Sequence, residues 1–160
     1  MNVIWPNGMS LPSLSGMQVE WQQPNSSLPG GQSTTLAQYT ATGKADTTFG
    51  NGGYVSSGGY FYPQYLSDGS FVESTSVNGV TSIQHFSKAG KPDTTFAGNV
   101  GQLQAPSGVS LSWVTVLKDD SFIANGTTTD GTNTPVLVHY LKTGVLDTAY
   151  GSGGVITAPA

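Results

Sequence analysis

Apolar and polar residues alternate over short stretches of this chain, and turn residues separate the stretches. Residues 113–117, 121–124 and 135–140 are rich in β-branched and aromatic side chains, which is typical of strands. Four pairs of residues between apolar stretches favour hairpin turns: Asp68-Gly69, Asn78-Gly79, Asp119-Asp120 and Asp130-Gly131. No window shows a sustained apolar period of about 3.6 residues, so the pattern predicts an all-β protein with almost no helix.

Three segments of the chain repeat one another. They cover residues 36–50, 83–97 and 137–151, and each contains an aspartate followed by threonine. An aromatic side chain comes three residues after each aspartate. The aspartates are Asp46, Asp93 and Asp147, and the aromatic residues are Phe49, Phe96 and Tyr150. A second block, with an acidic turn ahead of an apolar stretch, recurs at residues 66–72 and 117–123.

These repeats predict the organisation of the whole chain. We expect a single repeat domain over residues 1–160, made of three units at approximately 1–60, 61–112 and 113–160. Each unit of roughly 50 residues reads as strand, turn, strand, turn, strand. The prediction is therefore three antiparallel β-sheet repeats, arranged as propeller blades or as a β-solenoid.

The repeated motif resembles that of the delta-60 repeat family, Gly-x-x-Asp-(Ser/Thr)-x-Phe-Gly-x-x-Gly. Residues 43–53 match this pattern, and residues 144–154 match it with tyrosine in place of phenylalanine. A weaker copy follows Gly90, with its later glycines shifted. The resemblance covers nearly the full length and implies a propeller-like β fold, but it implies no particular activity.

We interpret the repeated aspartates as turn-forming residues. A carboxylate accepts backbone N–H groups two or three residues further along, helped by the following threonine hydroxyl. The aromatic residue three positions later is expected to fill the core between neighbouring sheets. The alternative is that Asp46, Asp93 and Asp147 are ligands or catalytic acids, but a catalytic residue does not usually recur three times. Acid–base chemistry needs two groups in different environments near one substrate, so we predict that the protein is not an enzyme.

Composition narrows the remaining functions. Only 9% of residues are charged, the formal net charge is −4, and the chain has neither Cys nor Arg. Five lysines do not supply the basic patch that nucleic-acid binding requires. No apolar run approaches the ~18–20 residues of a membrane span. We expect no cofactor, with a Ca²⁺ site built from turn carbonyls and Asp130 as an alternative.

Aromatic residues are dense near the junction of the first two predicted units. Glycine and serine flank a cluster that consists of Tyr54, Tyr60, Phe61, Tyr62 and Tyr65. Such side chains pack one blade against its neighbour or against another subunit. The alternative is a platform on which a sugar ring stacks.

Three blades are fewer than propellers usually contain, and an open stack leaves sheet edges exposed. We therefore expect self-association or docking onto other proteins. The N-terminus shows no secretory signal pattern, whereas the low charge and the Gly-, Ser- and Thr-rich composition resemble those of extracellular proteins. Both features are met by a structural protein of a bacteriophage particle, made in the host cytosol and placed on the head or tail of the virion. The alternative is a lectin or surface adhesin module, located outside the cell or on its surface, that binds a glycan.

Overall fold

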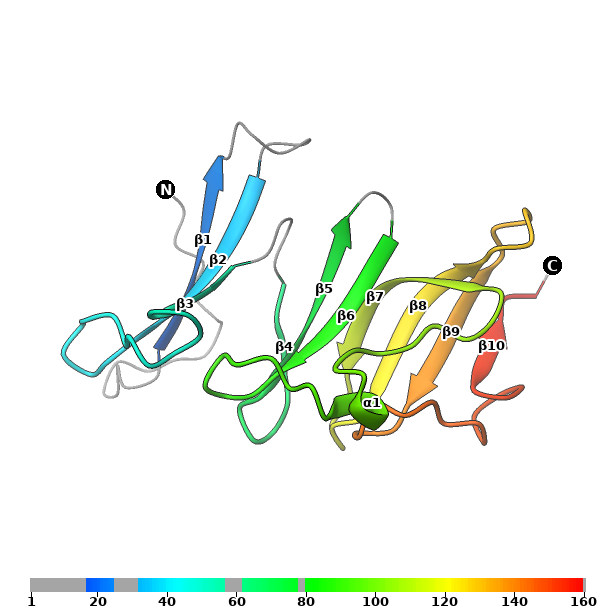
Figure 1. Cartoon of the computed structure of the whole chain (residues 1–160). Coiled ribbons are helices and arrows are strands. Elements are labelled where there is room, and N and C mark those ends of the chain that lie inside the picture. The colour runs from blue at the N-terminus through cyan, green and yellow to red at the C-terminus, as the bar shows by residue number, and fades with distance from the viewer. Residues whose placement is uncertain (1–16, 25–31, 57–61, 78–79, 160) are drawn as a thin grey trace. The chain divides into compact units, whose positions relative to one another are not determined.

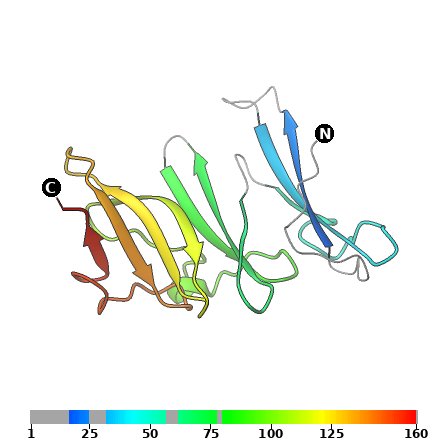
Figure 2. The ribbon, with the colours of Figure 1, turned by 180° about the vertical axis from the view of Figure 1, so that it is seen from behind.

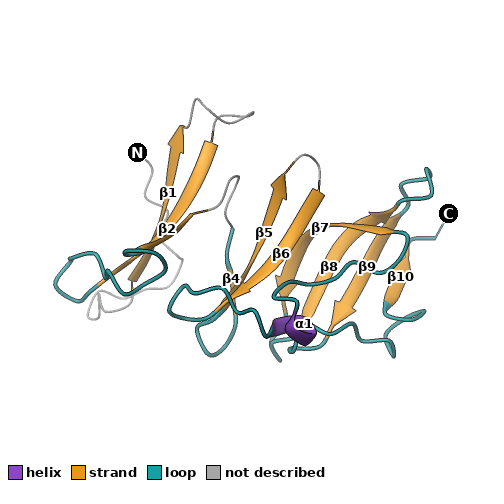
Figure 3. Cartoon of the chain, in the orientation of Figure 1, coloured by secondary structure: helices purple, strands orange, loops and turns teal. Residues whose placement is uncertain are grey.

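The structure is a computed structural model, and it describes residues 17–24, 32–56, 62–77 and 80–159. It confirms the all-β prediction, because the described residues form three antiparallel sheets (Figures 1 and 3). The one helix among them is the single turn α1 (Phe96–Asn99), drawn in purple in Figure 3. None of the described helical residues forms a segment long and apolar enough to cross a membrane.

The chain divides into two compact units. Unit 1 comprises residues 1–61 together with Ala89–Lys91, and unit 2 comprises Tyr62–Lys88 and Pro92–Ala160. In unit 1, β1 (Met17–Pro24), β2 (Gln32–Tyr39) and β3 (Tyr54–Ser56) form a sheet in the order β1-β2-β3. Leu36 and Val55, which are paired across β2 and β3, are both buried.

Unit 2 holds two sheets. The first has the order β4-β5-β6, from β4 (Gln64–Tyr65), β5 (Phe71–Val77) and β6 (Val80–Phe86). The second has the order β10-β9-β8-β7, from β7 (Val109–Val116), β8 (Phe122–Thr128), β9 (Pro135–Tyr140) and β10 (Val155–Thr157). Figure 2 shows these four strands side by side from behind. A four-stranded antiparallel sheet in sequence order is the form of a propeller blade.

The turns of unit 2 lie where acidic turn signals occur in the sequence. Asp68-Gly69 lies between β4 and β5, Asp119-Asp120 between β7 and β8, and Asp130-Gly131 between β8 and β9. The fourth predicted turn, Asn78-Gly79, lies outside the described residues. Strand β7 begins at Val109, ahead of the predicted start of the third unit at residue 113.

A bulge explains why this part of β7 does not follow a simple alternation. The register of β7 against β8 shifts between Leu111 and Trp113, so Leu111 and Val114 both face the interior although they are three residues apart. Gly126 lies opposite, and a Cβ there would come within 2.1 Å of the Ser110 carbonyl oxygen. The bulge therefore requires glycine at this point of β8.

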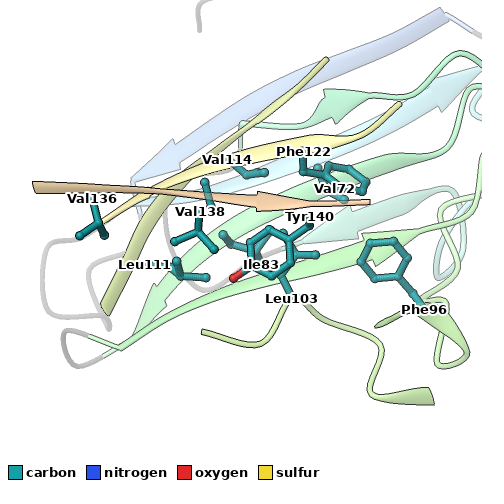
Figure 4. Close-up of a cluster of buried hydrophobic side chains, with 11 residues drawn as sticks. Val72, Ile83, Phe96, Leu103, Leu111, Val114, Phe122, Val136, Val138 and Tyr140 are labelled. Carbon is teal, nitrogen blue, oxygen red and sulfur yellow. The ribbon is translucent and has the colours of Figure 1, made fainter. Parts of the chain in front are cut away.

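The core of unit 2 lies between its two sheets. On β9, Val136, Val138 and Tyr140 point inward while Leu137 is exposed, as expected for a half-buried strand. Figure 4 shows these side chains with the rest of the cluster, which contains Val72, Ile83, Phe96, Leu103, Leu111, Val114, Phe122 and Ala124. Burial of each large apolar side chain stabilises the fold by about 1.5–3 kcal/mol.

Candidate functional site

Each repeated aspartate holds a tight turn through one carboxylate oxygen. Asp46 Oδ1 accepts the Thr48 N–H at 3.0 Å and the Thr48 hydroxyl at 2.6 Å. Asp93 does the same with Thr95, at 2.9 and 2.6 Å. Asp147 Oδ1 accepts the Ala149 N–H at 3.1 Å. The hydroxyl comes from the residue two positions after the aspartate rather than from the threonine that directly follows it.

The second carboxylate oxygen binds a side chain from the preceding strand. Asp93 Oδ2 lies 3.0 Å from His85 Nδ1, and Asp147 Oδ2 lies 2.9 Å from His139 Nδ1. In the first copy the Gln38 amide takes this place and donates to Asp46 Oδ2 at 3.4 Å. An imidazole and an amide thus make the same contact in different copies of the repeat.

In the second and third copies, the histidine extends the network to a serine and a further aspartate. His85 Nε2 lies 3.2 Å from Ser70 Oγ, and the Ser70 hydroxyl donates to Asp68 Oδ1 at 2.5 Å. The corresponding distances for His139, Ser121 and Asp119 are 3.2 and 2.6 Å. We call each of these an Asp-His-Ser-Asp chain. Neither serine is among the predicted site residues, although both lie in the recurring block at residues 66–72 and 117–123.

The heavy atoms of each Asp-His-Ser-Asp chain resemble the triad of a serine hydrolase. The serine hydroxyl, however, donates to an aspartate and not to the histidine. A nucleophilic serine gives its proton to histidine Nε2. Here the Ser70 hydroxyl donates its single proton to Asp68 Oδ1, so Ser70 Oγ has no proton left to donate to His85 Nε2. Ser70 and Ser121 are each only 4% exposed. This arrangement fixes a turn, and both serines are largely buried, although Ser70 also lines an open cleft beside His85.

The pKa values of these carboxyl groups follow from the hydrogen bonds that they accept. The hydroxyl and the backbone N–H of Ser70 hold the pKa of Asp68 below its usual range, and Ser121 has the same effect on Asp119. For Asp93, the Thr95 hydroxyl lowers the pKa most, against an opposing contribution from burial. These carboxylates therefore remain charged acceptors at neutral pH.

An open cleft of about 510 Å³ lies beside the Asp-His-Ser-Asp chain of His85, whose residues line part of it. Its charged and polar walls include Asp68, Asp93, Asp120 and Lys142. The Asp120 carboxylate accepts hydrogen bonds from Ser67, from its N–H at 2.8 Å and from its hydroxyl at 2.5 Å. Of the three carboxylates in the walls, each is thus an acceptor in a structural hydrogen bond.

The aromatic residues after the repeated aspartates differ in burial. Phe49 is 1% exposed and Phe96 is 6% exposed, whereas Tyr150 remains partly exposed. Phe96 stacks on the His85 ring with centroids 4.4 Å apart, and Tyr150 packs against His139 at 5.0 Å. Phe96 and Tyr150 thus pack on corresponding histidines, but only Phe96 is buried.

The predicted aromatic cluster is only partly described. Tyr60 and Phe61 lie outside the described residues. Tyr54, in unit 1, and Tyr62 and Tyr65, in unit 2, are exposed by 46%, 41% and 45%. Tyr62 also packs edge-on against Trp113, with ring centroids 5.4 Å apart.

Asp130, the residue of the alternative Ca²⁺ site, is occupied by hydrogen bonds within its own turn. Its Oδ1 accepts the Thr128 hydroxyl at 2.8 Å, the Thr132 hydroxyl at 2.6 Å and the Thr132 N–H at 3.0 Å. These bonds, led by that of the Thr132 hydroxyl, lower the pKa of Asp130 to about 2. Within the described part of the chain, no group of three or more His, Asp or Glu side chains is placed to hold a metal ion.

Comparison of the chain with protein-family models, with curated proteins and with solved structures finds no match. The resemblance to the delta-60 repeat therefore stays a prediction from the motif residues.

Proposed function

We propose that this protein is a non-enzymatic structural component of a larger assembly, and that the assembly is a bacteriophage particle. One observation carries the non-enzymatic part of the proposal. The most enzyme-like arrangement among the described residues occurs twice, and in both copies the serine is buried and its proton is committed to an aspartate. A catalytic centre needs one reactive group poised near a substrate, not two copies of a satisfied hydrogen-bond chain.

The proposed setting rests on composition and on repeat architecture. The chain combines 9% charged residues with 22 glycines and has no cysteine, and side-chain hydrogen bonds hold the turns after Asp46 and Asp93. Stacked repeats bury their faces against neighbours, so an array of few repeats is suited to work in contact with other chains.

Two measurements test this proposal. A fluorophosphonate probe, which reacts with nucleophilic serines, is expected to leave Ser70 and Ser121 unlabelled. Labelling that disappears in Ser70→Ala or Ser121→Ala would show that the non-enzymatic assignment is wrong. Mass spectrometry of purified virions from a lysate of the source phage is expected to find the protein in constant proportion to the major capsid protein. Its absence from washed particles would remove the virion assignment.

A second candidate function is glycan binding by exposed tyrosines. The exposure of Tyr62 and Tyr65 in one unit favours it, since aromatic faces stack on sugar rings. A glycan array measures this directly. Binding that is lost in Tyr62→Ala and Tyr65→Ala, but kept in Tyr39→Ala as a control on unit 1, would support the lectin function over the purely structural one.

A further inference from the structure

One contact between successive repeats occurs twice in this chain. In unit 1, the Phe49 ring packs on Gly90, where an added Cβ would lie 2.9 Å from its ring atoms. In unit 2, the Phe96 ring packs on Gly144, where an added Cβ would lie 2.5 Å from the ring. We call this the ring-on-glycine contact. It joins the aromatic residue after one repeated aspartate to the turn glycine that precedes the next.

A backbone hydrogen bond accompanies the contact each time. The Gly50 N–H donates to the Ala89 carbonyl at 2.8 Å, and the Ala97 N–H donates to the Thr143 carbonyl at 2.9 Å. The donor follows the aromatic residue and the acceptor precedes the glycine in both cases. In unit 1, the Lys91 ammonium also donates to the Gly50 carbonyl.

The first repeat presents an unused glycine half of this contact. Gly43 corresponds to Gly90 and Gly144, and it has a similar φ of +75°. Gly90 and Gly144 are buried, whereas Gly43 is exposed and an added Cβ there would meet no atom within 4 Å. The adjacent Thr42 carbonyl accepts no backbone N–H among the described residues, and Lys44, which corresponds to Lys91, is exposed.

The third repeat presents an unused aromatic half. Tyr150 corresponds to Phe49 and Phe96 but is partly exposed. Gly151 is exposed, and within the described chain its N–H donates to no backbone carbonyl. The substitution of tyrosine for phenylalanine suits this position, because a phenol tolerates water on one side and an apolar partner on the other.

Resting on the proposed structural function, we infer that a second copy of this chain docks its Tyr150 ring onto Gly43, which repeats the ring-on-glycine contact between molecules. The Gly151 N–H of one copy donates to the Thr42 carbonyl of the other, and Lys44 reaches the Gly151 carbonyl as Lys91 reaches Gly50. The occupant is a second copy because the same molecule carries both complementary halves. Such a head-to-tail interface produces a closed ring or a filament.

Two variants each remove one half of the interface. Gly43→Ala places a methyl group where the incoming ring would lie, in space that no described residue of the same chain fills. Its matched control is Gly52→Ala, because Gly52 has a φ of +67° and also meets no atom within 4 Å. Tyr150→Ser removes the ring, and Tyr150→Phe is the control that keeps it.

Light scattering over a series of protein concentrations measures the mean mass. The unmodified chain and both controls are expected to exceed the 16.5 kDa monomer as concentration rises, while Gly43→Ala and Tyr150→Ser stay monomeric. An equimolar mixture of these two variants retains one intact head and one intact tail. It is therefore expected to reach twice the monomer mass and no more, and this pairing also shows that both variants are folded.

Three results would overturn the inference: an unmodified chain that is monomeric at every concentration, a Gly43→Ala variant that assembles as well as Gly52→Ala does, or a mixture that stays monomeric. A chain that closes its contact within one molecule gives the first result. None of these bears on the virion assignment, which the particle composition decides separately.

Discussion

The ring-on-glycine contact of unit 2 makes a sharp prediction about stability. Gly144→Ala would place a Cβ 2.5 Å from two ring atoms of Phe96 and 2.9 Å from a third. The ring has little room to move aside, because it stacks on His85 and meets Phe122 edge-on at 5.7 Å. A real Cβ does not approach so closely, so the repeats must shift apart to accommodate it.

The control for this substitution is Gly108→Ala in the same unit. Gly108 has a φ of +76°, close to the +78° of Gly144, but an added Cβ meets no atom within 4 Å. The left-handed conformation costs alanine about 1–2 kcal/mol, and the reduced freedom of the unfolded chain offsets about 0.4–1 kcal/mol of this. We therefore expect Gly108→Ala to lower the free energy of unfolding by roughly 0–1.6 kcal/mol.

Gly144→Ala carries the same net backbone penalty and adds overpacking of about 1–3 kcal/mol, for a total of roughly 1–4.6 kcal/mol. Amide hydrogen exchange in β8 and β9 reports the opening free energy of unit 2 and avoids assuming that the whole chain unfolds in one step. In a Phe96→Leu background, the smaller side chain should reduce the difference between the two variants. Equal destabilisation by Gly144→Ala and Gly108→Ala would show that the Phe96 ring does not resist the added methyl group.

Three further predictions concern hydrogen bonds. The pKa of Asp130 is lowered from 3.8 to about 2 in the folded state, so its contribution to the free energy of unfolding is complete above pH 3.8 and is lost as the pH falls towards 2. Over this pH range, the urea midpoint should fall less in Asp130→Asn than in the unmodified protein. His139→Gln should be tolerated better than His139→Leu in thermal unfolding, since Gln38 makes the equivalent contact, and equal losses would contradict this. Tyr140→Phe loses the hydrogen bond to the Gln104 carbonyl and should cost about 1 kcal/mol in urea at pH 7. Burial raises the pKa of Tyr140, so the unmodified protein should lose stability above pH 10, and Tyr140→Phe should lose less.

Much of the fold follows from local signals in the sequence. The stretch at residues 135–140 matches β9, and the acidic turns lie between the strands that they were expected to connect. The early start of β7 was missed because a bulge breaks the alternation on which strand prediction depends. The second repeat also inserts one residue before Gly101, which donates to the Phe96 carbonyl as Gly53 donates to that of Phe49.

The Asp-His-Ser-Asp chains were harder to predict than the turns. Ser70 and His85 are 15 residues apart, and their contact depends on the register of β5 against β6. The correspondence of His85 with His139 was visible in the sequence, and so was that of Ser70 with Ser121. To infer that the histidine contacts the serine, one must also know which strands are neighbours in the sheet. The contact between Asp120 and Ser67 depends on how successive repeats pack, which no local pattern specifies.

The two Asp-His-Ser-Asp chains have a consequence for recognising hydrolases by shape. A template of heavy-atom distances for serine, histidine and aspartate would match this molecule at Ser70 and again at Ser121. In both places the aspartate two positions before the serine accepts the hydroxyl hydrogen bond, a feature that such a template leaves out. A template that includes this acceptor would distinguish the two Asp-His-Ser-Asp chains from a triad whose serine hydroxyl donates to the imidazole.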